Sequence, residues 1–108
     1  MSKRKLVALS IFICLSAQAD FRDGNKLLAE MKGTTFEKGM ALGYVMAVAD
    51  TRGSESLCIP STVTAGQVID MTQNMLEKNP SIRHLPASAI VEYTLREVWP
   101  CAKKGTGL

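Results

Sequence analysis

Apolar residues recur at the three- to four-residue spacing of helices through most of residues 20–108. A short first helix is expected to begin at Asp23 or Asn25, which are both good N-caps, and to end at Gly33. Its apolar stripe consists of Leu27, Leu28 and Met31. No segment alternates apolar and polar residues as a half-buried strand does. The pattern therefore predicts an all-α fold.

A second helix is expected after Thr34, because Thr34 and Glu37 have the spacing of a capping box. Residues 39–49 carry no charge, so we expect this helix to be the central element, buried on nearly all sides. Three small residues recur in it every four positions: Gly39, Gly43 and Ala47. Small residues allow a neighbouring backbone to come close, so this spacing predicts helix packing. The glycine-rich loop of a phosphate site has a different pattern.

The polar residues 50–61 are expected to form the longest loop of the domain. Thr64 and Gln67 then form a second capping box, which opens a third helix. This helix should stop near Asn79, because Pro80 disfavours helical geometry in the residue before it. Its apolar positions have helical spacing: Val68, Ile69, Met71, Thr72, Met75 and Leu76.

A fourth helix is expected to start at Pro86, a residue that suits a first helical turn, and to end at Trp99 and Pro100. Its buried stripe is predicted to be Ile90, Val91, Thr94, Leu95 and Val98. We therefore expect a compact bundle of four short helices. Residues 102–108, with two lysines and two glycines, are expected to form a frayed tail.

The first 19 residues have the order of a secretory signal peptide. Basic residues at positions 3–5 precede an apolar run at 6–15 and the small-x-small pattern of Ala17, Gln18 and Ala19. The run is about half the length of a membrane span, which needs about 20 apolar residues. We expect cleavage after Ala19, export of a single domain at residues 20–108, and no stable membrane insertion afterwards.

Cleavage would also remove the excess positive charge of the chain. Residues 20–108 contain ten Lys or Arg and ten Asp or Glu, so the net charge of +3 belongs to the leader. Nucleic acids and anionic lipids are captured by clustered Lys and Arg, so a neutral domain argues against both partners. Two cysteines remain, Cys58 and Cys101, and an even pair in a short exported chain predicts a disulfide. This bridge should join the start of the third helix to the end of the fourth. These two ends lie together when the two helices are antiparallel.

Candidate catalytic groups are few. His84 is the one histidine, and metal sites and nucleophile–base pairs need several such groups to converge. Both thiols are assigned to the disulfide, which leaves no cysteine nucleophile. Tyr44, Tyr93 and Trp99 lie at positions compatible with packing in the core. We expect no metal, no cofactor and no enzymatic activity.

The order of several short motifs resembles the Rap/Tai immunity proteins, which protect bacteria against peptidoglycan amidase toxins of type VI secretion. The motifs extend over nearly all of residues 20–108. They are Asp23-Gly24-Asn25-Lys26-Leu27-Leu28, Gly43-Tyr44-Val45, Ala49-Asp50, Cys58-Ile59-Pro60, Val63-Thr64-Ala65-Gly66-Gln67, His84-Leu85-Pro86-Ala87-Ser88-Ala89 and Pro100-Cys101. Members of that family typically have a second cysteine pair, with one cysteine in the first helix region and one shortly before the Gly-Tyr. Here those regions hold Met31 and Met40-Ala41-Leu42.

The resemblance implies a periplasmic helical protein that binds a secreted peptidoglycan amidase effector and inhibits it by blocking its catalytic cleft. We expect the contact to lie on the polar loop close to the disulfide, at Arg52, Ser54, Glu55 and Ser56. A rigid loop favours affinity, because ordering a floppy one on binding costs free energy.

Two other functions are compatible with the same sequence. One is a periplasmic acid-stress chaperone, which would expose apolar surface at low pH. The other is an envelope protein with the immunity fold but no toxin partner, since a fold does not decide a function. The apolar content of the chain is also compatible with a homodimer.

Overall fold

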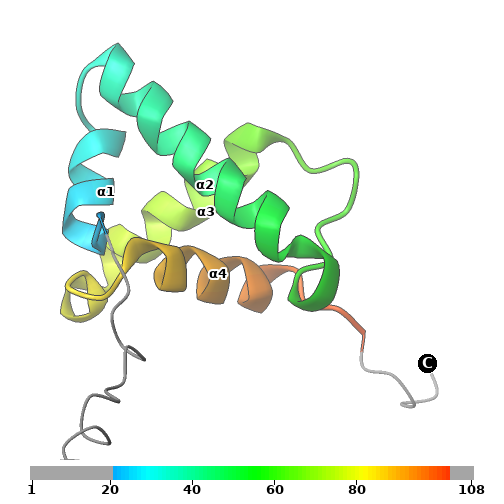
Figure 1. Cartoon of the computed structure of the whole chain (residues 1–108). Coiled ribbons are helices and arrows are strands. Elements are labelled where there is room, and N and C mark those ends of the chain that lie inside the picture. The colour runs from blue at the N-terminus through cyan, green and yellow to red at the C-terminus, as the bar shows by residue number, and fades with distance from the viewer. Residues whose placement is uncertain (1–20, 103–108) are drawn as a thin grey trace, which may run out of the picture.

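The computed structural model describes residues 21–102, apart from the side chains of residues 53–56, and these residues form the predicted helical bundle (Figure 1). The helices are α1 (Gly24–Met31), α2 (Thr35–Ser56), α3 (Ala65–Lys78) and α4 (Ala87–Val98), and a 3-10 turn, η2 (Pro80–Ile82), follows α3. In the described part of the chain, strand-like pairing is limited to isolated β-bridges. The all-α prediction is confirmed.

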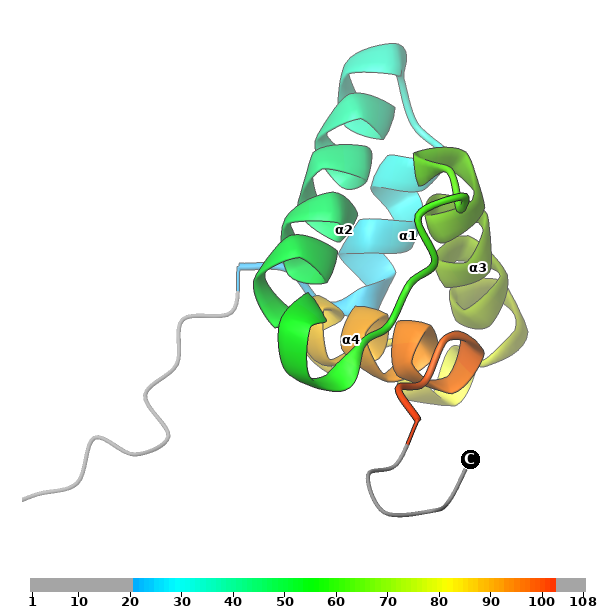
Figure 2. The same cartoon turned by 90° about the vertical axis from the view of Figure 1, so that its right-hand side faces the viewer.

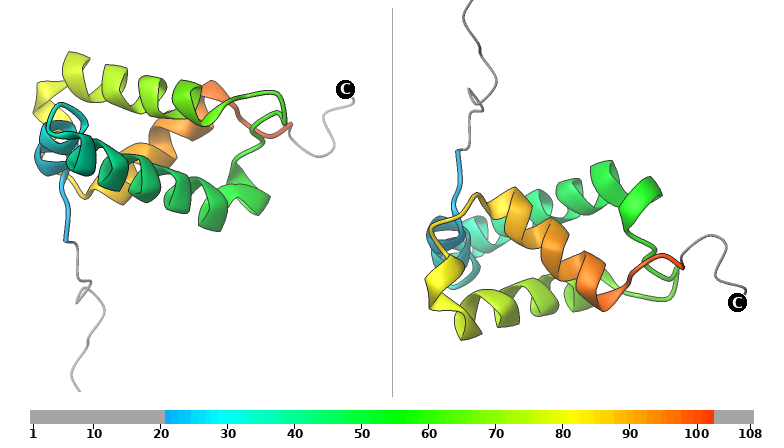
Figure 3. Two further views of the ribbon diagram at one scale, coloured as in Figure 1. Left: turned by 90° about the horizontal axis from the view of Figure 1, so that it is seen from above. Right: turned by 90° about the horizontal axis from the view of Figure 1, so that it is seen from below.

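The helices α2 and α4 run in the same general direction, and α3 runs opposite to both (Figures 1 and 3). The short helix α1 lies at the end of the molecule where α2 begins and α3 finishes. Each of the other three helices packs against α2. The predicted antiparallel arrangement of α3 and α4 is confirmed.

The helix starts are set by the caps that the sequence predicts. Asp23 accepts a hydrogen bond from the amide of Lys26 at 2.8 Å and so caps α1. Thr34 and Glu37 form a reciprocal capping box at α2, and Thr64 and Gln67 form another at α3. These bonds use amide donors that the first turn of a helix leaves without partners, which is why the helices begin at these residues.

The core is formed by one side of each α-helix. Leu27, Val45, Leu76 and Leu95 are completely buried. The predicted stripes are confirmed for α1, for Val68, Thr72 and Leu76 of α3, and for the first four positions of α4. Thr72 and Thr94 satisfy their buried hydroxyls by donating to the carbonyls four residues earlier. The prediction was wrong for Val98, which is 40% exposed in the last turn of α4.

The helix α2 is longer than predicted. Residues 50–61 were expected to form a loop, but the helix continues to Ser56, and the connection to α3 is limited to residues 57–64. Thr51 supports the extension, because its hydroxyl donates to the carbonyls of Ala47 and Val48 within the helix. Polar residues are compatible with a helix that lies at the surface, so polarity alone did not mark a loop here.

The prediction that α2 is buried on nearly all sides was also wrong. Only one side is buried, through Ala41, Val45, Val48 and Ala49. Its small residues, Gly39, Gly43 and Ala47, are all exposed. A Cβ atom added at Gly39 or Gly43 would meet nothing within 4 Å. These positions therefore do not bring another helix of the same chain close. The lack of charge in residues 39–49 did not indicate burial on all sides.

Gly43→Ala is expected to stabilise the monomer by about 0.5–1 kcal/mol, because alanine favours an exposed helix interior more than glycine does. Urea unfolding of the purified domain at low protein concentration measures this change. Gly24→Ala is the matched control and should destabilise the domain, since an added Cβ would lie 2.7 Å from Ile90 Cδ1 and 2.9 Å from the backbone of Arg83. Equal effects of the two substitutions would contradict this reading of the glycines.

An N-terminal strap, residues 21–23, ties the start of the domain to its last helix. The amide of Ala87 donates to the carbonyl of Arg22 at 3.0 Å, and the amide of Gly24 donates to the carbonyl of Leu85 at 3.1 Å. The Arg22 side chain makes two hydrogen bonds to Glu30 and lies 5.1 Å from the centre of the Tyr44 ring. The strap thus connects α1, α2 and α4 through one residue.

Candidate partner-binding surface

The C-terminal end of α2 is held against α4 by charged side chains. Arg52 donates through Nη1 to one carboxylate oxygen of Glu92, and Arg96 donates to the other at 3.4 Å. The two arginines are nearly half exposed, whereas Glu92 is mostly covered. Exposed ion pairs contribute at most about 1 kcal/mol each, so the main result of this cluster is a defined orientation of the helix end.

The predicted disulfide between Cys58 and Cys101 is present and lies beside the same helix end. The amide of Cys58 donates to the carbonyl of Trp99, and Leu57 pairs with Pro100 in a β-bridge. Cys58 follows α2 by two residues, so the bridge joins the ends of α2 and α4 rather than the entry of α3. Figure 2 shows the 57–64 segment running from this point to the start of α3.

The four residues predicted to contact a partner lie in the last turns of α2 rather than in a loop. Arg52 is exposed at this helix end and is paired with Glu92. Ser54, Glu55 and Ser56 are helical in their backbone, and their side chains lie outside the described part of the structure. A helical segment is already ordered before binding. The rigidity that was expected from a loop held by the disulfide therefore comes from the helix itself.

Asp50 borders a hollow on the other side of α2, which sequence reasoning did not identify. The hollow has a volume of about 270 Å³ and lies between α2, the 57–64 segment and the start of α3. Its lining is mostly apolar, with Met46, Leu57, Ile59 and Val63 among its walls. A helix turns about 100° per residue, so Asp50 and Arg52 lie on opposite sides of α2 and cannot belong to one contact with a small partner group.

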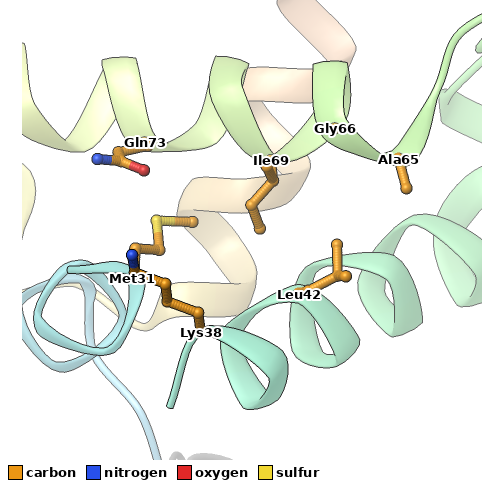
Figure 4. Close-up of a pocket in the computed structure, with 7 residues that line it drawn as sticks. All are labelled: Met31, Lys38, Leu42, Ala65, Gly66, Ile69 and Gln73. Atoms are coloured by element: carbon orange, nitrogen blue, oxygen red, sulfur yellow. The ribbon is translucent and has the colours of Figure 1, made fainter. Parts of the chain in front are cut away.

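A second hollow, of about 360 Å³, lies between α2 and α3 near α1 (Figure 4). Met31, Leu42 and Ile69 point into it from the three helices. Lys38 and Gln73 supply polar atoms at its edge. The hollow holds no group suited to catalysis, and its apolar walls are consistent with a gap in side-chain packing.

Three aromatic side chains, Tyr44, Tyr93 and Trp99, were predicted to pack in the core. Tyr44 and Trp99 are partly buried against the core, as predicted. The prediction was wrong for Tyr93, which is 49% exposed and borders an apolar hollow of about 520 Å³ between α3, η2 and α4. His84 is exposed in the turn before α4. Within residues 21–102, no three His, Cys, Asp or Glu side chains gather in a way that could hold a metal ion.

The described surface thus combines ordered helix ends, apolar hollows and exposed ion pairs. None of the helices in residues 21–102 has the length and apolar character needed to cross a membrane. The sequence model of the Rap1a immunity proteins matches residues 23–101, from the cap of α1 to the second cysteine of the disulfide. The chain belongs to the Rap1a immunity protein family. A comparison with curated proteins finds no match.

Membership of the Rap1a immunity family confirms the resemblance that the sequence motifs indicated and supports a toxin as a protein partner in general. The family match contains all four helices. Met31 of α1 and Leu42 of α2 border one hollow, so these parts of the two helices lie close together (Figure 4).

Proposed function

We propose that this Rap1a family member is a periplasmic immunity protein that binds a peptidoglycan amidase toxin of type VI secretion and blocks its catalytic cleft. The observation that carries the proposal is the family match across the whole helical domain. The Cys58–Cys101 bridge supports the location, because structural disulfides persist in oxidising compartments such as the periplasm. The leader expected at residues 1–19 would deliver the chain there, although it lies outside the described residues.

We place the toxin contact at the C-terminal end of α2, on Arg52, Ser54, Glu55 and Ser56. Three constraints hold this helix end before any partner arrives: the Arg52–Glu92 ion pair, the Leu57 bridge to Pro100 and the disulfide. An amidase that uses a cysteine and a histidine is inhibited when a rigid element excludes substrate from its cleft. A preordered helix end does this with little loss of conformational entropy on binding.

The test is inhibition of the amidase by purified residues 20–108 with the disulfide intact. A candidate toxin is a small amidase encoded beside this chain, and hydrolysis of isolated peptidoglycan measures its activity. The wild-type domain should form a complex and abolish hydrolysis. Absence of both binding and inhibition with every adjacent amidase would overturn the proposed function.

The double substitution Arg52→Ala with Glu55→Ala is expected to weaken binding of the toxin about tenfold or more, as loss of central interface side chains does. Isothermal titration calorimetry measures the change. The melting temperature should fall only slightly, because the lost Arg52–Glu92 pair is largely exposed. Asp70→Ala, which removes an exposed charge from α3, is the control and should bind as the wild type does. Unchanged affinity of the double variant would remove this helix end from the contact while leaving the immunity function standing.

A further inference from the structure

One charged residue, Asp50, stands alone where α2 meets the 57–64 segment and the start of α3. It borders the hollow of about 270 Å³ between these three elements. The rest of the lining is uncharged, and residues 57–69 contain no charged residue. Asp50 is exposed, and within the described structure its carboxylate makes no hydrogen bond or ion pair. The hollow therefore has one uncompensated negative charge at its edge.

The walls of this hollow are mostly apolar and only partly covered by the rest of the domain. Met46, Ile59 and Val63 pack against the core, but each keeps part of its surface exposed. Thr64 and Ala65, at the start of α3, are exposed. Small-molecule sites usually measure about 300–1,000 Å³ and enclose most of their ligand. This hollow is smaller, and it suits one long side chain of a protein better than a free ligand.

A lysine or arginine side chain has the two parts that this hollow complements. Its aliphatic stem covers apolar surface while its charged head stays at the edge, in water or against a carboxylate. Asp50 is also near the C-terminal end of α2, where the last carbonyl groups carry partial negative charge and favour a cation. An acidic side chain would be repelled here. A wholly apolar one would cover the carboxylate without pairing it, which costs free energy.

The opposite side of the same helix end carries the opposite sign of charge. Arg52 and Arg96 share the single carboxylate of Glu92, so that cluster has a net positive charge. A partner that meets both sides of the helix end must present a basic group toward Asp50 and an acidic or polar group toward the arginines. Such a pattern of charges fixes the orientation of a complex and disfavours the reverse approach.

We infer that the hollow beside Asp50 receives a lysine or arginine side chain of the toxin, with its stem against Met46 and Ile59 and its charged head on the carboxylate. This inference rests on the proposed immunity function and adds to it the chemistry of one contact. It extends the toxin contact from the last turns of α2 to the 57–64 segment, which the disulfide at Cys58 anchors. Asp50 has no partner within the described residues, so binding requires its charge while folding does not.

Calorimetric titration of the toxin into disulfide-bonded residues 20–108 tests the role of the charge. Asp50→Asn should weaken binding about tenfold, and Asp50→Lys about a hundredfold, because a like charge then faces the basic group. Asp50→Glu keeps the charge and should bind nearly as the wild type does. Asp70→Lys makes the same change of charge at an exposed position of α3 and should leave the affinity unchanged. The melting temperature of each Asp50 variant should stay close to that of the wild type.

The dependence of binding on salt separates a charge contact from a change of shape. The affinity of the wild type should fall as the salt concentration rises. The affinity of Asp50→Asn should fall less steeply, because one pair of opposite charges is missing from its complex. Equal salt dependence of the two proteins would show that Asp50 meets no cation, and would overturn the inference.

Ala65→Leu tests the hollow itself without changing any charge. The larger side chain occupies part of the hollow, so it should weaken binding of the toxin about tenfold. Ala47→Leu is the matched control, because it makes the same change at an exposed position outside the hollow. Unchanged affinity of Ala65→Leu or of Asp50→Lys overturns the inference and leaves the immunity function standing. A wild type that binds no adjacent amidase overturns the proposed function, and this contact with it.

Discussion

Replacing Cys58 and Cys101 together by alanine is expected to lower the free energy of unfolding by about 4 kcal/mol, the chain-entropy value for a loop of this length. The two cysteines are 43 residues apart, so the bridge greatly restricts the unfolded chain. A small domain has a net stability of about 5–15 kcal/mol, which makes this loss a large part of the total. Leu57 and Trp99 keep some backbone pairing near the former bridge, so we expect the variant to fold, but marginally.

Urea unfolding followed by circular dichroism measures this loss. The wild-type domain in excess dithiothreitol is the matched control, because it lacks the bond but keeps both side chains. Its unfolding midpoint should fall to nearly that of the double variant. A double variant as stable as the oxidised wild type would show that the bridge restricts little conformational freedom in the unfolded chain.

Glu30→Ala is expected to destabilise the domain by about 2 kcal/mol, because it leaves Arg22 largely buried without its partner. The side chains of Arg22 and Glu30 are 16% and 9% exposed, and Nε of Arg22 lies 2.8 Å from the carboxylate. Breaking a fully buried ion pair costs about 3–5 kcal/mol, and the remaining exposure of Arg22 reduces the expected value. Thermal and urea unfolding should both detect the change.

Lys26→Ala is the control for this prediction. Lys26 approaches the same carboxylate at 3.9 Å but is 57% exposed, so its removal should change the stability very little. A double-mutant cycle of Arg22→Ala and Glu30→Ala should give a coupling well above the error of the measurement. Equal losses from Lys26→Ala and Glu30→Ala would show that burial does not decide the strength of this pair.

The contribution of Arg22 to the free energy of unfolding should not change with pH around neutrality. Its hydrogen bonds to Glu30 raise the pKa of Arg22 above its ordinary value, against the opposing effect of burial. A raised pKa in the folded state gives stability that is fully present below the unfolded pKa and is lost only as the pH rises through the folded value. The effect of Arg22→Ala should therefore stay constant between about pH 7 and 10.

The features that the sequence predicted well are local. The cap residues Asp23, Thr34 and Thr64 bond to amides three residues away, and Pro80 acts on its immediate neighbour. The disulfide was predicted because only one pairing remains after the leader is removed. These features need no knowledge of how the helices are arranged.

The features that were missed depend on contacts between distant residues. The burial of Arg22 requires Glu30 and Tyr44, and the second partner of Glu92 is Arg52, forty residues away. The sequence did not show whether the side of α2 that contains its glycines is exposed or buried, because glycine and alanine suit both a close helix contact and an open surface. The proposed toxin contact would be a property of the surface, which no short motif for catalysis or metal binding identifies.

The N-terminal strap has a consequence for the order in which the domain folds. Arg22 bonds to Ala87 and the neighbouring Gly24 bonds to Leu85, and Cys58 must find Cys101, close to the end of the helical region. A chain that emerges N-terminus first, from a ribosome or a translocation channel, cannot complete either contact until nearly all of it is free. Such a polypeptide stays loosely structured while it is threaded, and acquires its final shape in one late, concerted step.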